Sequence, residues 1–398
     1  MNASLGNSPL LPLGEEAGTA PGDRAFRPDV EGLRAVAILL VVLFHTRIGL
    51  FRGGMVGVDA FFVISGFVIT GLLLRERQRN GSTKLLPFYA RRARRILPAA
   101  LLVIVVSLIA TALLRDHGTL VEVASDSRWT AVFLANFHFA QVLPNVFSTH
   151  PQNLLHYWSL AVEEQFYLVY PTFFIIMVVL VRRWSIATRL GIGLSAIIGV
   201  SLYVSVTTSQ VGVFHAYDLP FARAWELAVG CLVAAATAAF QRLPLALAAF
   251  ITWLGLIGLI VSAMVISVHV SYPGYAALFP VLSTALVIAG GAVAPPRGAE
   301  TVLAAGPMQW IGRRSYSWYL WQPLVFIVAA DFVHKIPQQL PIAATAALAV
   351  FSLAVAAASY SWVENPVRHS RWLAERPHAV FLGAGLLITS CVALTFAF

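Results

Sequence analysis

Residues 33–51 read LRAVAILLVVLFHTRIGLF, and residues 57–75 read GVDAFFVISGFVITGLLLR. Each stretch is apolar over about the twenty residues that an α-helix needs to cross the hydrocarbon core of a bilayer. Only residues 52–56 separate them. The pair therefore predicts two neighbouring membrane helices joined by a short turn.

The same pattern continues along the chain and predicts an all-α fold, a polytopic transmembrane helical bundle of about eleven spans. Residues 127–143 form a shorter and more polar segment, with Arg128, Asn136, His138 and Gln141. We expect this segment to be an interfacial or re-entrant helix on the outer side. The predicted spans are 33–51, 57–75, 97–114, 157–181, 186–206, 219–239, 244–267, 275–293, 315–331, 340–361 and 379–397.

The composition agrees with a membrane protein. Of the 398 residues, 59% are hydrophobic and only 11% are charged, whereas soluble domains carry roughly 25% charged residues. This excludes a soluble globular enzyme, a disordered chain and a secreted disulfide scaffold. Cys231 and Cys391 both lie in apolar runs, which favours packing over a disulfide, and the histidine spacing predicts no metal site.

The charges set the orientation. There are 27 Lys and Arg residues against 18 Asp and Glu, a net charge of +9. With eleven spans, twenty of the cations fall on the side of the N-terminus, five fall on the other side, and Arg34 and Arg223 lie within spans. This bias predicts a cytoplasmic N-terminus, an outer C-terminus and contact with anionic lipid rather than nucleic acid. Residues 1–26 lack an apolar core and are predicted to be a disordered cytoplasmic tail.

Ionisable residues inside membrane spans are costly, so they are candidates for function. Arg34 and His45 share one face of the first span, about 16 Å apart along its axis. In the fourth span, His156 and Glu163 share a face, and Glu164 follows directly. Counted from the expected span ends, His45 and Glu163 reach a similar depth, which suggests a general base and the acid that orients it. The alternatives are a snorkelling anchor at the membrane surface for Arg34, a hydrogen bond between helices for His45, and a structural polar pair for His156 and Glu163.

The sixth span holds Arg223 and Glu226, and Asp59 lies at the outer mouth of the second span. These three residues are candidates to contact a substrate in an outer cavity, although Arg223 and Glu226 have the spacing of a simple ion pair. Ser65 and Gly66 are small enough to favour a close approach of two helices.

On the cytoplasmic side, Arg91, Arg92, Arg94 and Arg95 precede the third span. Arg313 and Arg314 precede the ninth span. Guanidinium groups suit phosphates, so this basic zone could bind a phosphorylated cytosolic molecule, the alternative being a contact with lipid.

Taken as a set, several motifs resemble the acyltransferase 3 family of bacterial integral-membrane O-acyltransferases, which includes acetylases of O-antigen and other surface glycans. The resemblance covers roughly residues 27–376, with 377–398 as an additional C-terminal transmembrane helix. The motifs are Arg27 to His45, Gly57 to Phe67, Phe88 to Pro98, His156 to Tyr167, Arg223 to Gly230, Ser315 to Trp321 and Glu364-Asn365-Pro366.

The resemblance implies that cytosolic acyl-CoA, usually acetyl-CoA, donates an acyl group to a hydroxyl at or beyond the outer leaflet of the bacterial inner membrane. Acyl-CoA would be a co-substrate, with no permanently bound cofactor. His45 would act as base or acyl carrier, and Glu163 or Glu164 as the intramembrane acid, with Glu163 favoured. The family's arginines map onto Arg34, Arg92 and Arg95, and Arg314 could join them at the CoA phosphates. The acceptor would meet Asp59, His156, Arg223 and Glu226.

Two departures from the family pattern are visible. A histidine usually follows Tyr-Leu-Trp, but Gln322 stands there in this chain. Many relatives continue into an outer SGNH-type hydrolase domain, whereas this sequence stops at Phe398. We therefore expect any second catalytic step to come from a separate periplasmic or extracellular partner or to be absent. Two rival functions remain open: a transporter or flippase for an anionic glycolipid, which needs no CoA, and a scaffolding subunit, which would tolerate loss of His45.

Overall fold

The structure is a computed structural model that describes residues 26–142, 153–180, 183–210, 217–267 and 271–397. The predicted tail at residues 1–26 lies almost entirely outside these residues. Within them, all regular secondary structure is helical, as predicted. The helices are α1 (Pro28–His45), α2 (Gly57–Asn80), α3 (Leu85–Leu114), α4 (His117–Ala131), α5 (Ala135–Val142), α6 (Tyr157–Val179), α7 (Ile186–Gln210), α8 (Pro220–Ala235), α9 (Thr237–Phe240), α10 (Leu245–Val265), α11 (Leu278–Gly290), α12 (Glu300–Leu303), α13 (Gly306–Phe332), α14 (Ile342–Ser359), α15 (Asn365–Arg368), α16 (Arg371–Ala374) and α17 (Pro377–Leu394).

Eight helical segments among the described residues are long and apolar enough to cross a membrane, so the chain is a multi-pass membrane protein. They correspond to eight of the eleven predicted spans. The other three are α1, α8 and α13, which are shorter or carry more polar and charged residues. Polar side chains gather on these three helices, among them His45 on α1, Arg223 on α8 and Tyr319 on α13. The eight segments are Gly54–Asn80, Leu85–Leu114, Tyr157–Val179, Ile186–Gln210, Leu245–Val265, Tyr275–Val293, Ile342–Arg368 and Pro377–Ala397.

The polar segment predicted at 127–143 is not one continuous helix. It is divided between α4 and α5, and the chain turns between them at Phe133, whose φ is 56°. Neither helix meets the length of a membrane span, in keeping with the prediction that this region does not cross.

The first span is shorter than predicted. α1 ends at His45 rather than continuing to residue 51, because Arg47 has a φ of 60°, in the left-handed region. The Arg47 guanidinium donates hydrogen bonds to the carbonyl oxygens of Gln338 and Leu340, which fix this turn against the chain before α14. His45 therefore stands at the end of a helix instead of well inside one.

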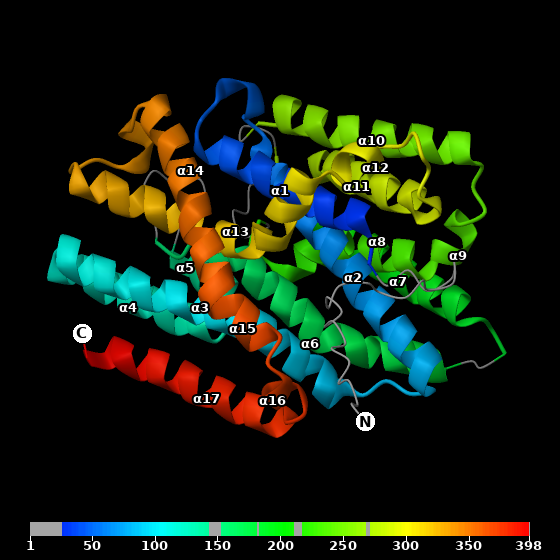
Figure 1. Ribbon diagram of the computed structural model, residues 1–398, viewed down its shortest axis with the longest axis horizontal. Helices are drawn as coiled ribbons and strands as arrows, with labels where there is room; N and C mark the ends of the chain where they lie inside the picture. The colour runs from blue at the N-terminus through cyan, green and yellow to red at the C-terminus, as the bar shows by residue number, and fades with distance from the viewer. Residues whose placement is uncertain (1–25, 143–152, 181–182, 211–216, 268–270, 398) are drawn as a thin grey trace, which may run out of the picture.

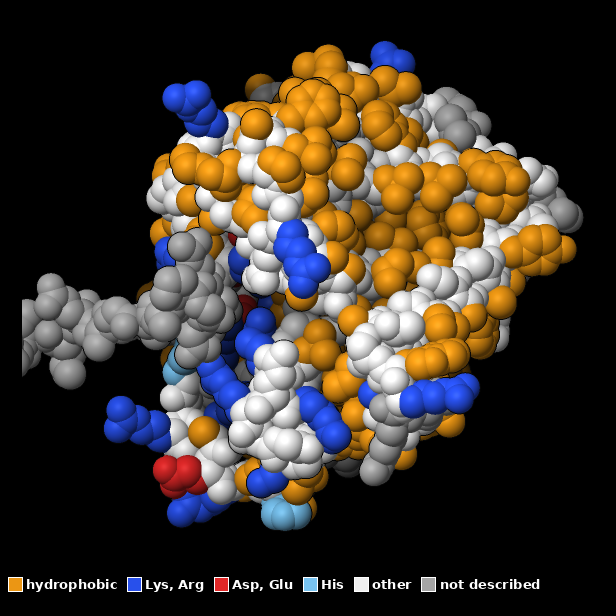
Figure 2. All heavy atoms as spheres, turned by 90° about the vertical axis from the view of Figure 1, so that its right-hand side faces the viewer, with side chains coloured by type: hydrophobic (Ala, Val, Ile, Leu, Met, Phe, Trp, Pro, Cys, Tyr) orange, Lys and Arg blue, Asp and Glu red, His pale blue; other side chains and the backbone are white. Residues whose placement is uncertain are grey.

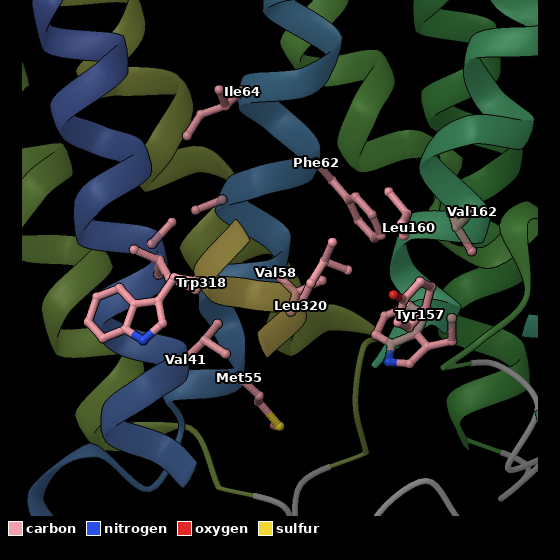
Figure 3. Packing of buried hydrophobic residues seen from close by; sticks show 14 of the residues in the cluster. Val41, Met55, Val58, Phe62, Ile64, Tyr157, Leu160, Val162, Trp318 and Leu320 are labelled. Carbon is pink, nitrogen blue, oxygen red and sulfur yellow. The ribbon is translucent and has the colours of Figure 1, made fainter. Parts of the chain in front are cut away.

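α1, α2 and α13 pack together, and α17 lies along one edge of the molecule against α3 and α4 (Figure 1). Side chains from α1, α2, α6 and α13 meet in one apolar cluster, among them Val41, Val58, Leu160 and Leu320 (Figure 3). The core therefore holds four of the helices that carry the candidate site in a fixed register.

Candidate active site

A cavity of about 90 Å³ lies where α1, α2, α3, α6 and α13 meet. One part of its wall is apolar, formed by Val58, Phe61, Phe62, Ile64 and Leu160 among others. The polar part consists of Arg34, Ser65, Arg92, Arg95, Ser159, Glu163, Tyr167, Ser315, Tyr316 and Tyr319. The cavity thus combines a charged region with an apolar one.

Three of the four arginines assigned from the sequence to a phosphorylated donor line this cavity. Arg34 donates a 3.0 Å hydrogen bond to Ser315 Oγ. The Arg92 guanidinium lies 3.4 Å from the centre of the Tyr167 ring and 3.4 Å from Glu164 Oε1. Arg95 lines the cavity without a hydrogen bond or ion pair to another described residue, so its donors are available to a ligand.

Arg314, the fourth, does not line the cavity. Its guanidinium stacks over Trp310 at 4.0 Å and Tyr360 at 5.0 Å, and its Nη1 donates to the Trp310 carbonyl oxygen. Its assignment to the donor site therefore finds no support in the geometry.

Among the described residues, Glu163 is the one carboxylate that lines the cavity. Its Oε1 accepts hydrogen bonds of 2.7 Å from both Ser65 Oγ and Tyr167 Oη, and it lies 3.7 Å from Arg92. Ser65 therefore has a polar partner, whereas the close helix approach expected of it is made by Gly66 together with Gly230 of α8. An added Cβ on Gly66 would lie 1.9 Å from the Leu227 carbonyl oxygen.

The balance of charge in the cavity favours an anion. Three guanidinium groups and one carboxylate line the cavity, with 16% of the Arg34 side chain and 21% of the Glu163 side chain accessible. Glu31 and Glu164 do not line it, although they lie 3.9 Å from Arg34 and 3.4 Å from Arg92. Figure 2 shows Lys and Arg side chains gathered around a hollow, with acidic side chains visible inside it. Guanidinium forks in such a setting are suited to phosphate oxygens.

His45 lies outside this cavity and has a separate partner. Its Nδ1 is 2.7 Å from Oε1 of Gln322 on α13. An amide oxygen can only accept a hydrogen bond, so Nδ1 carries the hydrogen and Nε2 keeps its lone pair. The imidazole is therefore held in the tautomer that can take a proton from an alcohol.

His156, immediately before α6, lies near His45, and the two imidazoles interact electrostatically. Its ring contacts Tyr157 and Tyr319, with centroids 4.8 and 5.7 Å away. The side chain is buried, the Leu320 backbone lies beside the ring, and neither ring nitrogen makes a well-formed hydrogen bond to a described residue. A second imidazole is thus available beside the first.

The expected pairing of Glu163 with His45 is corrected by these positions. The depth of His45 was counted from residue 51, but α1 ends at His45. The electrostatic interaction of His45 with His156 places His45 near the start of α6, and Glu163 lies two helical turns further along α6, about 10 Å from His156 along the axis. Glu163 and Glu164 both belong to the arginine-rich side of the site.

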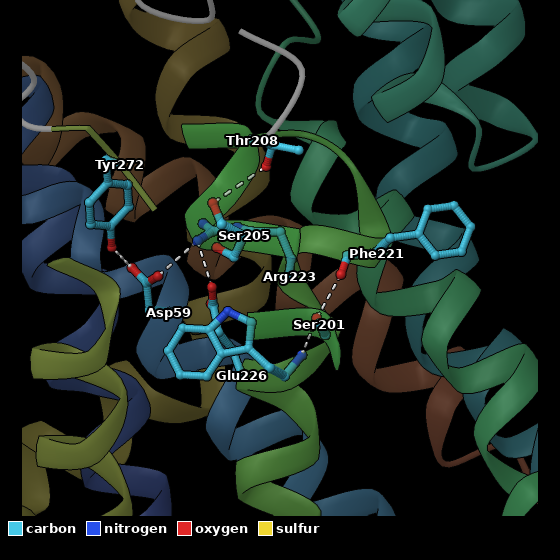
Figure 4. A network of polar contacts seen from close by, with 9 residues as sticks. Asp59, Ser201, Ser205, Thr208, Phe221, Arg223, Glu226 and Tyr272 are labelled. Atoms are coloured by element: carbon cyan, nitrogen blue, oxygen red, sulfur yellow. Dashed lines mark hydrogen bonds and ion pairs between the residues drawn. The ribbon is translucent and has the colours of Figure 1, made fainter. Parts of the chain in front are cut away.

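The candidates for acceptor contact on α2 and α8 form a closed network (Figure 4). The Arg223 Nη1 atom lies 3.1 Å from Asp59 and 2.6 Å from Glu226, and the Tyr272 hydroxyl donates to Asp59. The side chains of Arg223, Asp59 and Glu226 have no exposed surface. This confirms the ion pair of Arg223 and Glu226 and leaves the network no surface that an acceptor could touch in this structure.

Tyr319, Tyr167, Ser159 and Ser315 also belong to the site, although the sequence reasoning did not select them. A signal was present, because Ser315, Tyr319 and Gln322 are spaced as neighbours on one face of a helix. Tyr167 likewise lies one turn after Glu163. Neutral polar residues in apolar helices attract less attention than charged ones, which is why they were missed.

Comparison with known proteins identifies the family of the chain. The family model described as an acyltransferase domain matches residues 27–361. The peptidoglycan O-acetyltransferase OatA of Listeria monocytogenes is 29% identical over 362 residues, 88% of this chain and 57% of the relative. The O-acetyltransferase OatA of Staphylococcus aureus is 29% identical over 360 residues, 86% of this chain and 57% of the relative.

The chain therefore spans a little more than half the length of these curated relatives. No solved structure is significantly similar to it.

Proposed function

The chain belongs to the acyltransferase domain family, and on this premise we propose that the protein is a membrane O-acyltransferase that moves an acyl group from acyl-CoA to a glycan hydroxyl. The observation that carries the proposal is the pairing of an anion-binding cavity with a histidine held in the base tautomer. The acceptor class follows the peptidoglycan named for the Listeria relative.

The arginine-lined cavity is suited to the donor. Coenzyme A carries several phosphate groups, and Arg34 of α1 and Arg92 and Arg95 of α3 supply guanidinium groups to one cavity. Arg92 is pre-oriented by its stacking on Tyr167, and Arg95 has its donors free for a phosphate. The apolar wall beside them offers a dry place for the acyl thioester.

His45 supplies the proton chemistry. Its Nε2 accepts the hydroxyl proton as the acceptor oxygen attacks the thioester carbonyl carbon. The carbon–sulfur bond then breaks, and the proton passes from His45 to the departing thiolate. The products are an ester and free CoA thiol, and His45 returns to its starting form.

The positive-inside charge pattern supports a donor that enters from the cytosol and a cytoplasmic N-terminus. In this arrangement the arginine-lined cavity faces the cytosol, and His45 lies toward the acceptor side of the bacterial inner membrane.

The test is thiol release from acetyl-CoA by the purified protein in lipid nanodiscs, with soluble peptidoglycan fragments as acceptors. His45→Ala should lower turnover at least about 10²-fold, the lower end of what a general base contributes. His45→Gln should be equally inactive, because an amide cannot accept a proton at neutral pH. His378→Gln, at an exposed position on α17, is the matched control and should retain full activity.

If the wild-type protein moves glycolipid across the membrane without consuming acetyl-CoA, the result would refute the proposal and favour a flippase. Full activity of His45→Gln would remove His45 from the mechanism.

A further inference from the structure

Tyr319 lies on α13 between the arginine-lined cavity and His45. One turn before it, Ser315 accepts a hydrogen bond from Arg34, and one turn after it, Gln322 holds His45. At 1.5 Å per residue, Tyr319 lies about 6 Å from the level of Ser315 and about 4.5 Å from that of Gln322. Its side chain is therefore at the boundary between the arginine-lined cavity and His45.

The Tyr319 side chain crosses from α13 to two other helices. Its hydroxyl lies 2.7 Å from Ser159 Oγ and donates a 2.9 Å hydrogen bond to the His156 carbonyl oxygen, both at the start of α6. Its ring meets Phe61 of α2 edge-on, with centroids 6.3 Å apart. Tyr319, Ser159 and Phe61 all line the cavity, whereas His45, His156 and Gln322 do not. Tyr319, Ser159 and Phe61 therefore form the end wall of the cavity on the side of His45.

From this placement we infer that Tyr319 is the barrier between the donor cavity and His45, and that its side chain must leave Ser159 and His156 before an acyl group can reach the acceptor. The inference rests on the proposed function for the identity of the acyl group, but the barrier itself is a property of the structure. Tyr319 is a positioning residue in this account, since it acts by separating reacting groups.

The contacts suit a side chain that moves. The hydroxyl is held by two neutral hydrogen bonds, whose net contribution is modest, and the residue is partly exposed to the cavity rather than fully buried. While the wall is closed, water from the side of His45 is kept from a bound thioester. The barrier would therefore protect the donor from hydrolysis until an acceptor is in place.

The first experiment compares acetyl-CoA hydrolysis without acceptor to transfer with acceptor. In hydrolysis, water replaces the acceptor hydroxyl, and the products are acetate and CoA thiol. Tyr319→Ala should raise the ratio of hydrolysis to transfer at least about tenfold. Tyr319→Phe keeps the ring but loses both hydrogen bonds, so it should give a smaller rise. Tyr203→Phe, at an exposed position on α7, should leave the ratio unchanged. An unchanged ratio in a folded Tyr319→Ala protein would overturn the inference.

The second experiment does not depend on acyl transfer. Ser65 lines the cavity on the arginine side, and a Ser65→Cys variant can be labelled with a charged methanethiosulfonate reagent applied to either face of oriented vesicles. The native Cys231 and Cys391 are buried, and the wild-type chain measures their background. Labelling should occur from one face only, and from both faces when Tyr319→Ala is added.

Labelling from both faces with Tyr319 in place would overturn the barrier, as would one-sided labelling in the double variant. The expected labelling together with no consumption of acetyl-CoA would instead leave the barrier standing and refute the proposed function.

Discussion

Gln322 Oε1 accepts a 2.7 Å hydrogen bond from His45 Nδ1, so a side chain of α13 sets the tautomer of the candidate base at the end of α1. In the acyltransferase 3 pattern that the motifs resemble, a histidine usually occupies the position of Gln322. A histidine there could donate or accept, whereas an amide oxygen only accepts. In the observed orientation the Gln322 amide oxygen faces Nδ1, so the neutral imidazole carries its hydrogen on Nδ1 and keeps Nε2 free.

Replacing Gln322 tests this role. Gln322→Leu removes the acceptor for Nδ1 and keeps a similar side-chain volume, so the imidazole loses its fixed tautomer and orientation. The net worth of one such hydrogen bond is about 1–1.5 kcal/mol, which predicts a fall in kcat of about tenfold. The KM for acyl-CoA should not change, because Gln322 does not line the donor cavity.

The control is Gln78→Leu, at an exposed position near the end of α2, which should behave as wild type. Steady-state kinetics that show a rise in donor KM and an unchanged kcat in Gln322→Leu would contradict the assignment. In a His45→Ala background, Gln322→Leu should have no further effect.

The arginines are expected to separate into two groups. Arg92→Ala and Arg95→Ala should each raise the KM for acyl-CoA at least about tenfold, because a charge-assisted hydrogen bond to phosphate is worth about 1.5–3 kcal/mol. Arg314→Ala should leave this KM unchanged, since its guanidinium stacks on Trp310 and Tyr360 outside the cavity. Initial-rate measurements over a range of acetyl-CoA concentrations decide between them.

Arg52→Ala, in an exposed turn after α1, is a further control. Equal effects of Arg92, Arg314 and Arg52 substitutions would point to altered folding or lipid contact rather than to donor binding.

The helices and the polar side chains on them could be predicted from the sequence, because apolar length and charge pattern are local properties. The arginines that line the cavity on α1 and α3, namely Arg34, Arg92 and Arg95, could be identified for the same reason. The level of His45 could not be predicted, since α1 ends where Arg47 adopts a positive φ that no pattern of hydrophobicity reveals. The pairing of Glu163 with Ser65 and Tyr167 depends on how α2 and α6 are staggered, which only the packed structure shows.

Asp218 is expected to make stability depend on pH. It lies in the turn before α8, it is 1% exposed, and burial raises the pKa of its carboxyl from 3.8 to about 8. A carboxyl whose pKa is higher in the folded state binds its proton more tightly there. Its contribution to stability is therefore complete below about pH 4 and is lost as the pH rises toward 8.

An Asp218→Asn variant cannot ionise, so its Tm should exceed that of the wild type at pH 8 by several degrees and approach it at pH 4–5. Thermal unfolding in detergent across this range provides the measurement, with Asp116→Asn, at an exposed helix N-cap, as the control. A constant difference between wild type and Asp218→Asn at all pH values would show that Asp218 is ionised in the folded protein.

The crossing of α2 and α8 should be the most sensitive point of the bundle to an added methyl group. A Cβ on Gly66 would lie 1.9 Å from the Leu227 carbonyl oxygen, and a Cβ on Gly230 would lie 1.9 Å from the Val63 carbonyl oxygen. Both obstacles are backbone atoms, so the helices themselves must separate. Overpacking of this kind typically costs about 1–3 kcal/mol, and Gly66→Ala and Gly230→Ala should each lower the Tm in detergent.

Because both methyl groups would push apart the same pair of helices, their effects should not add, and the double variant should lose less stability than the sum of the single ones. Gly383→Ala, on α17 with nothing within 4 Å of an added Cβ, should keep or slightly raise the Tm. Gly66→Ala should also reduce acyl transfer, because the neighbouring Ser65 would be moved away from Glu163. A Gly66→Ala protein with the stability of Gly383→Ala would mean that α2 and α8 do not cross at this distance.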